Sequence, residues 1–196
     1  DYGIYPFTSS SNTIASYAPI GAGIPGCALD NVVGVMKAYS TCVGEGPFVA
    51  ETAMGEAWNE KLRESGGEFG AATGRPRRVG PFDAVASRYG IRCQKAQDIA
   101  LTKLDVLGAF DKIPVITGYR LHGVLLDSFP TDSGLEEAEP VIEELPGWGC
   151  DISGCRSWRD LPENARKYVC TLEKLVDHPI YLVSTGAERD AYLLRE

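Results

Sequence analysis

Apolar residues in this chain recur with two periods, one typical of helices and one typical of buried strands. Four segments have helical spacing, at 29–36, 50–58, 81–89 and 161–176. The last has the clearest stripe, and Asp160, Pro162 and Glu163 predict a capping box at its start. Short apolar runs between the helical segments predict strands, at 37–44, 99–106, 113–121, 124–130 and 179–186.

This alternation of helices with nearly continuous apolar strands predicts an α/β fold with a mostly parallel sheet and flanking helices. The turn at His122–Gly123 predicts a small antiparallel hairpin of its two flanking runs. The acidic segment 131–144 is interpreted as a solvated surface loop with a short helix. Because ligands bind at the carboxyl ends of parallel strands, we expect a site after the runs that begin at 99 and 179.

Composition and charge narrow the possible functions. The 196 residues are 44% hydrophobic, which predicts one ordinary globular unit with a core of its own. A net charge of −8 argues against a nucleic-acid binder, because that affinity comes from many Lys and Arg contacts. No apolar run approaches the length of a membrane helix and no secretory leader opens the sequence. We therefore expect a cytoplasmic protein without a membrane or nucleic-acid partner, and the opening at Asp1 rather than Met suggests a preceding segment.

The six cysteines contain no CxxC pair, and they are expected to be reduced, mostly buried thiols rather than a disulfide framework. Neither His122 nor His178 has the spacing of a metal ligand, so no metal site is expected.

The segment GEFGAATGRPRRVG, residues 67–80, differs from the rest of this acidic chain. Arg75, Arg77 and Arg78 follow a run of small residues that allows a ligand to approach the backbone. Arginine binds carboxylate or phosphate through two parallel hydrogen bonds. The segment therefore predicts a site for a small anionic substrate. The alternative is a surface cluster of arginines paired with the chain's many acids.

Two shorter motifs lie where strands are predicted to end. A carboxylate at Asp105 could accept hydrogen bonds from the N1–H and the amine of guanine, with the stem of Lys103 along the base. The small residues 184–186 leave backbone N–H groups open to a purine oxygen. Taken singly, an exposed Lys–Asp pair and a plain turn are the alternatives. At the amino end, residues 8–13 offer hydroxyl and amide groups to a phosphate, or form a flexible linker.

The motifs resemble, in order, those of the adenylosuccinate synthetase family. They are DYGIYPFTSSSNT, KAYSTCVGEGPF, GEFGAATGRPRRVG, LTKLDVL, ELPGW and STGAERD. The resemblance implies GTP-dependent ligation of IMP and L-aspartate to adenylosuccinate, by a cytoplasmic homodimer with a larger fold like that of P-loop NTPases. It covers only the carboxyl-terminal half of the family, so residues 1–196 are expected to be a single-domain fragment. The phosphate loop, the catalytic residues and the Mg²⁺ ligands are expected outside this chain, which should not turn over alone.

The same resemblance implies roles for individual residues. Substrate aspartate would be bound by Ala71, Ala72, Thr73, Gly74, Arg75, Pro76 and Arg77. IMP would be bound by Ser9 and Arg75. GTP would be bound by Arg77, Lys103, Leu104, Asp105, Ser184, Thr185 and Gly186. The sequence departs from the family at Ala72 and Ser9, where Thr is common, and at Pro76, where Arg is common.

Two other classes of function are compatible with the same residues. One is a non-catalytic module that binds a guanine nucleotide or another anion. The other is a structural interaction domain whose arginines are only surface charges.

Overall fold

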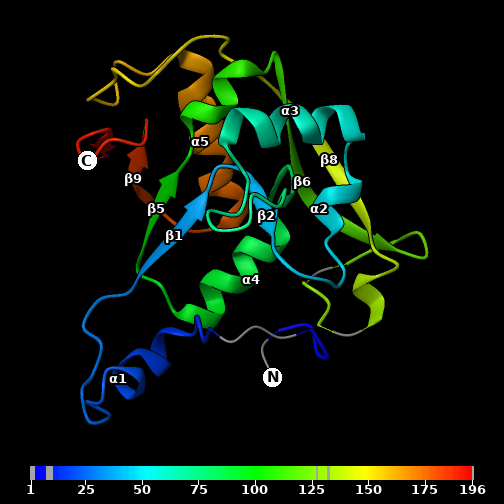
Figure 1. Ribbon diagram of the computed structural model, residues 1–196, viewed down its shortest axis with the longest axis vertical. Coiled ribbons are helices and arrows are strands. Elements are labelled where there is room, and N and C mark those ends of the chain that lie inside the picture. The colour runs from blue at the N-terminus through cyan, green and yellow to red at the C-terminus, as the bar shows by residue number, and fades with distance from the viewer. Residues whose placement is uncertain (1–2, 8–10, 127, 132, 196) are drawn as a thin grey trace.

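The main sheet has four strands and carries the expected parallel arrangement (Figure 1). A computed structural model of the protein describes residues 3–7, 11–126, 128–131 and 133–195. The strand order is β1 (Val33–Lys37), β5 (Asp98–Thr102), β9 (Ile180–Ser184) and β10 (Tyr192–Leu194). The first three are parallel and β10 is antiparallel to β9, so an α/β fold with a largely parallel sheet is confirmed.

A second sheet is built on the long strand β6 (Lys112–Leu121). Its other strands are β4 (Phe82–Asp83), β7 (Val124–Leu125) and β8 (Glu139–Pro146), and only β4 runs parallel to β6. The predicted hairpin at His122–Gly123 is confirmed, because Arg120 pairs with Leu125. The interpretation of 131–144 as loop and short helix is wrong beyond residue 138, since β8 begins there. A separate ribbon joins β2 (Ser40–Cys42) to β3 (Arg78–Gly80).

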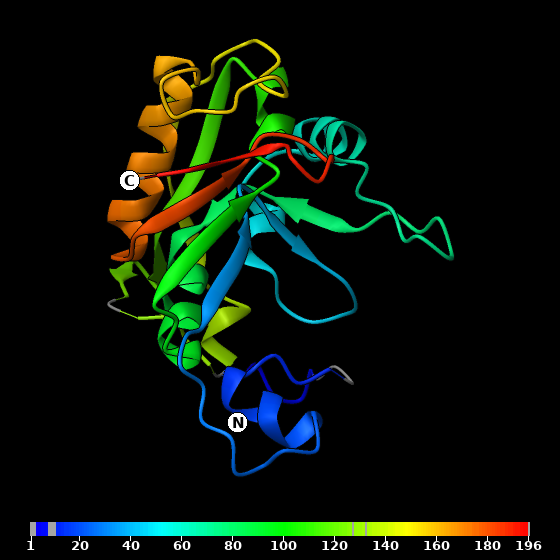
Figure 2. The ribbon, with the colours of Figure 1, turned by 90° about the vertical axis from the view of Figure 1, so that its left-hand side faces the viewer.

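The helices lie around these sheets. They are α1 (Ala18–Gly21), α2 (Val49–Thr52), α3 (Glu56–Gly66), α4 (Ala84–Gln94) and α5 (Glu163–Val176), with short 3₁₀ turns η1 (Ala15–Tyr17), η2 (Asp105–Ala109) and η3 (Ser133–Leu135). Figure 2 shows α5 along one side of the main sheet, while the loop between α3 and β3 projects from the opposite side.

The predicted stripe of α5 is confirmed, and it supplies much of the core. Ala165, Tyr168, Val169, Leu172 and Val176 are buried on its inner face. The predicted capping box is wrong, because α5 has no side-chain cap. The Asp160 carboxylate instead accepts backbone N–H bonds from the loop before the helix, at residues 156 and 157.

Three predicted helices have different bounds in the structure. The helix at 29–36 is wrong, because residues 33–37 form β1. A Cβ at Gly34 would lie 2.8 Å from Ile99 Cδ1, so strand pairing at this close approach overrides the apparent helical spacing. The helix at 50–58 is two helices, since Gly55 has extended backbone angles before α3. The third helix begins at Ala84, because residues 82–83 pair with β6.

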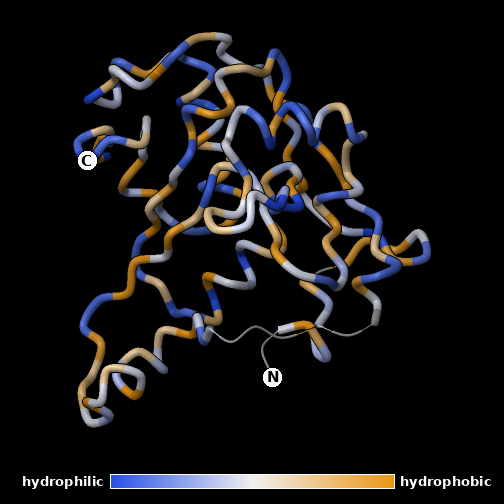
Figure 3. Tube along the Cα trace, in the orientation of Figure 1, coloured by the Kyte–Doolittle hydropathy of each residue, from blue (hydrophilic) through white to orange (hydrophobic). Residues whose placement is uncertain are grey.

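Hydrophobic and hydrophilic residues alternate over short distances along the trace (Figure 3). The apolar ones meet mainly between the main sheet, α4 and α5. Within the residues that the structure describes, no helix has both the length and the apolar character needed to cross a bilayer.

The buried carboxylate of Asp83 begins α4 and provides a test of the fold. It accepts hydrogen bonds from the N–H groups of Val85 and Ala86 and from the hydroxyl of Tyr119. Burial raises the pKa of the Asp83 carboxyl, although the three hydrogen bonds act to lower it. We expect Asp83→Ala to lower the free energy of unfolding by about 2–4 kcal/mol, because the cap is lost and the Tyr119 hydroxyl is left unpaired.

Asp83→Asn is the matched control, because it keeps a capping oxygen without burying a charge. Urea unfolding should give Asp83→Asn a free energy of unfolding much nearer to that of the unmodified protein. Equal losses in the two variants would contradict the capping role.

Candidate functional site

The two predicted strand-end motifs lie at the same edge of the main sheet. Strands β5 and β9 are parallel neighbours, with Leu101 paired to Val183. The segments that follow them, 103–105 and 184–186, therefore leave the sheet side by side. The structure brings these predicted residues together.

Within the first motif, the side chains have different environments. Lys103 has a left-handed backbone (φ 62°), and its Nζ donates to the Gly66 carbonyl at 2.9 Å. Leu104 is fully buried, so its side chain belongs to the core and only its backbone can face a ligand. Asp105 is partly exposed at the start of η2. Of the three side chains, the Asp105 carboxylate is the acceptor best placed for a ligand.

The second motif is tightly packed. Thr185 is fully buried, its N–H donates to the Ala191 carbonyl at 2.8 Å, and its hydroxyl donates to the Cys155 carbonyl at 3.2 Å. The Ser184 hydroxyl donates to the Gly186 carbonyl at 2.9 Å. These bonds fix the path of the chain, so the side chains of Ser184 and Thr185 are engaged with the protein itself.

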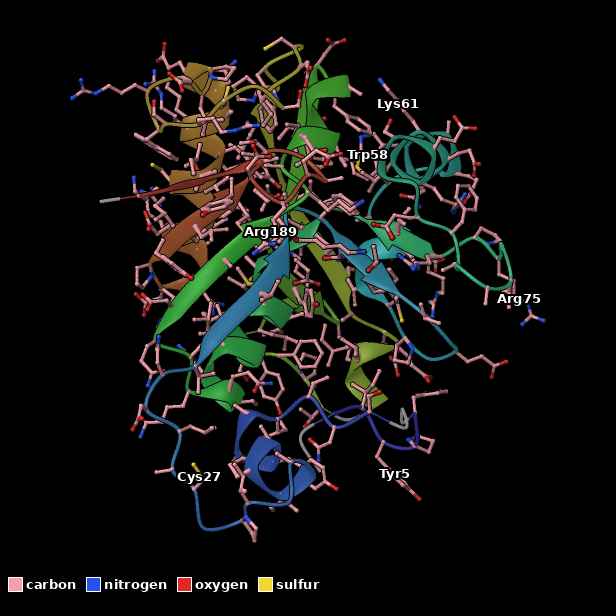
Figure 4. The ribbon with its side chains drawn as sticks, turned by 60° about the vertical axis from the view of Figure 1, so that its left-hand side comes forward. Tyr5, Cys27, Trp58, Lys61, Arg75 and Arg189 are labelled. Carbon is pink, nitrogen blue, oxygen red and sulfur yellow. The ribbon has the colours of Figure 1, made fainter. Side chains whose placement is uncertain are left out.

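The arginine-containing segment forms a narrow projection, here called the finger (residues 67–78). Its base is held by the Arg77 N–H to the Glu68 carbonyl at 2.9 Å, and by the Gly70 N–H to the Arg75 carbonyl at 2.8 Å. Gly74 has φ 64°, a conformation that favours glycine at the tip. Residues 71–76 are exposed, and Figure 4 shows Arg75 at the outer end, pointing away from the sheet.

The three arginines of the finger have three different environments. Arg78 is committed to the fold, since it pairs with Glu51 at 2.7 Å and donates to the carbonyls of Gly44 and Gly46. Arg77 is half-buried, and one of its guanidinium nitrogens, Nη1, pairs with the Glu68 carboxylate at 2.7 Å. Among the described residues, the Arg75 guanidinium has no protein partner, so it is the one fully open to an anion.

Glu68 is the central residue of a buried polar cluster at the base of the finger. Its carboxylate is 1% exposed and accepts from Lys37 Nζ at 2.8 Å, the Tyr39 hydroxyl at 2.6 Å and Arg77 Nη1 at 2.7 Å. Burial opposes its ionisation, but these three bonds outweigh burial and lower its pKa from 4.5 to about 2. We call these four residues the Glu68 cluster.

The Glu68 cluster joins the finger to the sheet edge. Lys37 is the last residue of β1, beside the end of β5. Burial, the hydrogen bond to Glu68 and the nearby charge of Asp105 all raise the pKa of Tyr39. The bond from Lys103 to the Gly66 carbonyl, next to the base of the finger, brings the end of β5 to the same region.

Sequence reasoning did not identify Lys37, Tyr39 or Gly66 as parts of this site. A Cβ at Gly66 would lie 2.5 Å from the Tyr39 hydroxyl, so the cluster requires glycine there. Lys37 could be found from the sequence as a lysine that ends an apolar strand. The predicted helix at 29–36 hides this pattern, because it removes the strand that Lys37 ends.

The remaining predicted groups are placed as follows. Ser9 lies outside the described residues. All six cysteines are unpaired, but the expectation of mostly buried thiols is wrong, because Cys27 and Cys150 are exposed and the others are half-buried. Across the described part of the chain, no group of three or more His, Cys, Asp or Glu is arranged to hold a metal ion.

Comparison with known proteins gives consistent matches. The sequence model of the adenylosuccinate synthetase family matches residues 1–193. Adenylosuccinate synthetase of Trichlorobacter lovleyi is 51% identical over 195 residues, covering 99% of this chain and 45% of that protein. The protein of the same name from Anaeromyxobacter sp. strain Fw109-5 is 49% identical, covering 100% and 45%. The structure of fully ligated adenylosuccinate synthetase from Plasmodium falciparum superposes with a TM-score of 0.92 at 37% identity, covering 100% of this chain and 47% of that one. The chain thus spans less than half the length of these relatives.

The low pKa of Glu68 predicts an acid-dependent loss of stability. Because its pKa is depressed in the folded state, its contribution is complete above 4.5 and is lost as pH falls toward 2. We expect Glu68→Gln to lower the free energy of unfolding at pH 7 by about 1.5–3 kcal/mol. The difference from the unmodified protein should shrink as pH falls through that window.

Urea unfolding at several pH values measures this difference, with the exposed Glu64→Gln on α3 as the matched control. A difference that stayed constant between neutral and strongly acid pH would contradict the role of Glu68.

Proposed function

The chain belongs to the adenylosuccinate synthetase family, and on that premise we propose that it takes part in the GTP-dependent ligation of IMP and L-aspartate to adenylosuccinate. In this proposal the chain supplies recognition of all three small molecules. The observation that carries the proposal is that the two strand ends meet at one edge of the main sheet, and that the Glu68 cluster joins this edge to the base of the finger.

We assign guanine recognition to the sheet edge. The Asp105 carboxylate would accept from the N1–H and exocyclic amine of guanine, whereas adenine would leave a charged acceptor unpaired. The stem of Lys103, held by its bond to the Gly66 carbonyl, would lie along the base. The turn at Gly186 would present backbone groups to the purine oxygen, since Ser184 and Thr185 are already engaged with the protein.

The finger would bind the anionic substrates. Exposed small residues at 71–74 would bring backbone N–H groups and the Thr73 hydroxyl to the carboxylates of aspartate. Arg75 would pair with aspartate and reach the ribose of IMP. Arg77, which shares only part of its guanidinium with Glu68, would reach toward the triphosphate of GTP. Ser9 would contact the IMP phosphate.

Phosphoryl transfer needs charge neutralisation and positioning groups, and the resemblance of the motifs implies that these lie outside this chain. We therefore propose that the Mg²⁺ ligands and the catalytic residues belong to another part of the complete protein, of which residues 1–196 would be one carboxyl-terminal domain. The resemblance of the motifs supports this division, and it supports a cytoplasmic homodimer as the working enzyme.

Turnover measurements test the proposal directly. The complete protein that contains this chain should form adenylosuccinate from IMP and aspartate only when GTP is present, and residues 1–196 alone should not. A complete protein that binds guanine nucleotide without forming product would favour the non-catalytic module instead.

In the complete protein, Asp105→Asn should reduce the preference for GTP over ATP by about tenfold or more, because the charged acceptor for two guanine donors is lost. The ratio of kcat/KM for the two nucleotides measures this preference. Asp111→Asn, an exposed acid just beyond η2, is the control. If the ratio were unchanged in Asp105→Asn, the carboxylate would not be responsible for recognition of the base.

Arg75→Ala should raise KM for aspartate and for IMP by about 10- to 100-fold, since each charge-assisted contact contributes about 1.5–3 kcal/mol. Arg75→Lys keeps the charge but not the two-bond geometry, so it should recover only part of the affinity. Steady-state kinetics with each substrate varied in turn provide the measurement. Equal KM values in the alanine variant and the unmodified protein would contradict the role of Arg75.

A further inference from the structure

A cleft lies between β10, at the end of the main sheet opposite to β1, and the loop that precedes α5. It has a volume of about 730 Å³ and is lined by residues 156–159 of the loop and by residues 190 and 192–195 at β10. Clefts of this size commonly hold small organic molecules. None of the described residues assigned above to aspartate, IMP or GTP lines it, so its role does not rest on the function proposed above.

The turn that carries Arg156 and Arg159 is ordered by its own hydrogen bonds. The Asp160 carboxylate accepts the N–H groups of Arg156 at 3.2 Å and Ser157 at 2.9 Å, and the Asp160 N–H donates to the Ser157 carbonyl at 3.1 Å. Arg156 Nη1 donates to the Ser153 carbonyl at 2.6 Å. Because the turn is already folded, less conformational entropy is lost when its arginines bind a ligand.

Strand β10 contributes an apolar surface to the cleft. Leu193 is buried against the sheet, and the alternation of side chains along the strand leaves Tyr192 and Leu194 43% and 57% exposed. Both exposed side chains belong to the lining of the cleft. They are therefore available to pack against the apolar part of a ligand.

Two contacts join the loop to the β10 side of the cleft, and they differ in strength. The Arg195 guanidinium lies 4.4 Å from the centroid of the Trp158 ring and donates to both carboxylate oxygens of Glu173, at 2.8 and 3.0 Å. Arg195 is thus fixed and its charge is compensated. Arg156 Nη2 lies 3.9 Å from Asp190 Oδ1, and both side chains are exposed. Because a long, exposed ion pair contributes little, Arg156 can exchange Asp190 for a ligand.

The charges of the lining favour an anion. The chain has a net charge of −8, yet the charged residues that line this cleft are Arg156, Arg159, Arg195 and one acid, Asp190. Arg159 is exposed and has no partner among the residues that the structure describes. The cleft therefore offers one free guanidinium and a second that is weakly paired, both on the same turn. Guanidinium groups bind phosphate and carboxylate oxygens through charge-assisted hydrogen bonds.

We propose that this cleft binds a small molecule that carries an anionic group, a phosphate or a carboxylate, on a flat apolar body. The anionic oxygens accept hydrogen bonds from Arg159 and from Nη2 of Arg156, which releases Asp190. The apolar body packs against the exposed side chains of Tyr192 and Leu194. Both parts of the ligand contribute to affinity, so a molecule with only one of them binds weakly.

Isothermal titration calorimetry with the complete protein tests the site. Phenyl phosphate and benzoate carry both parts of the proposed ligand, whereas inorganic phosphate and phenol carry one part each. The titrations contain saturating GDP, IMP and L-aspartate, which together cannot turn over and which fill the proposed substrate sites. Phenyl phosphate or benzoate should bind about tenfold more tightly than inorganic phosphate or phenol. The tighter of the two identifies the anionic group, and no binding of either would overturn the proposal.

Substitution of Arg159 locates the binding. Arg159→Ala should weaken binding of the tighter probe by about tenfold, because one charge-assisted contact is lost. Arg159→Lys should recover part of the affinity. The exposed Arg92→Ala on α4 is the matched control and should bind as the unmodified protein does. Equal affinities in Arg159→Ala and the unmodified protein, or equal losses in Arg159→Ala and Arg92→Ala, would overturn the assignment to this cleft.

Substitution of Asp190 should have the opposite effect. Asp190→Asn removes the carboxylate that competes for Arg156, so the tighter probe should bind about two- to fivefold more tightly. A damaged fold would not produce such a gain, and weaker binding in Asp190→Asn would contradict the proposal. Separate titrations with GDP and IMP alone test the function proposed above. Their failure to bind would count against that function and would leave the results for Arg159 and Asp190 unaffected.

Discussion

The arrangement of the site depends on one buried carboxylate. Glu68 is almost inaccessible to solvent, yet it remains ionised because Lys37, Tyr39 and Arg77 all donate to it. An unpaired charge in that position would be strongly destabilising, so the three donors and the acid must be in place together. Because Lys37 ends β1 and Arg77 lies at the base of the finger, the cluster fixes an exposed projection against the main sheet.

That constraint explains how arginines close together in the sequence have different uses. Arg78 is held by Glu51 and two carbonyls, and Arg77 is partly held by Glu68. These anchors leave Arg75 exposed on a finger whose base is already ordered. Less conformational entropy is lost when a finger of this kind binds an anion than when a free loop does.

Much of this architecture could be predicted from local patterns. The stripe of α5 and the runs that became β5 and β9 were clear, and parallel pairing then dictated that their ends meet. The predictions that are wrong concern segments whose structure depends on tertiary contacts. The spacing around Gly34 fits a helix until its close approach to Ile99 is known, and the acidic residues of β8 are tolerated because that strand lies at an edge. Glu68 meets Lys37 across 31 positions, a distance that no local pattern reveals.

The central claim is that Glu68 couples the finger to β1, and a double-mutant cycle measures that coupling most directly. The free energy of unfolding at pH 7 would be determined for Lys37→Met, Glu68→Gln, the double variant and the unmodified protein. A coupling energy of about 1–3 kcal/mol between the two positions is predicted, as found for residues that share one buried network. Losses that simply add, to within about 0.5 kcal/mol, would contradict the account.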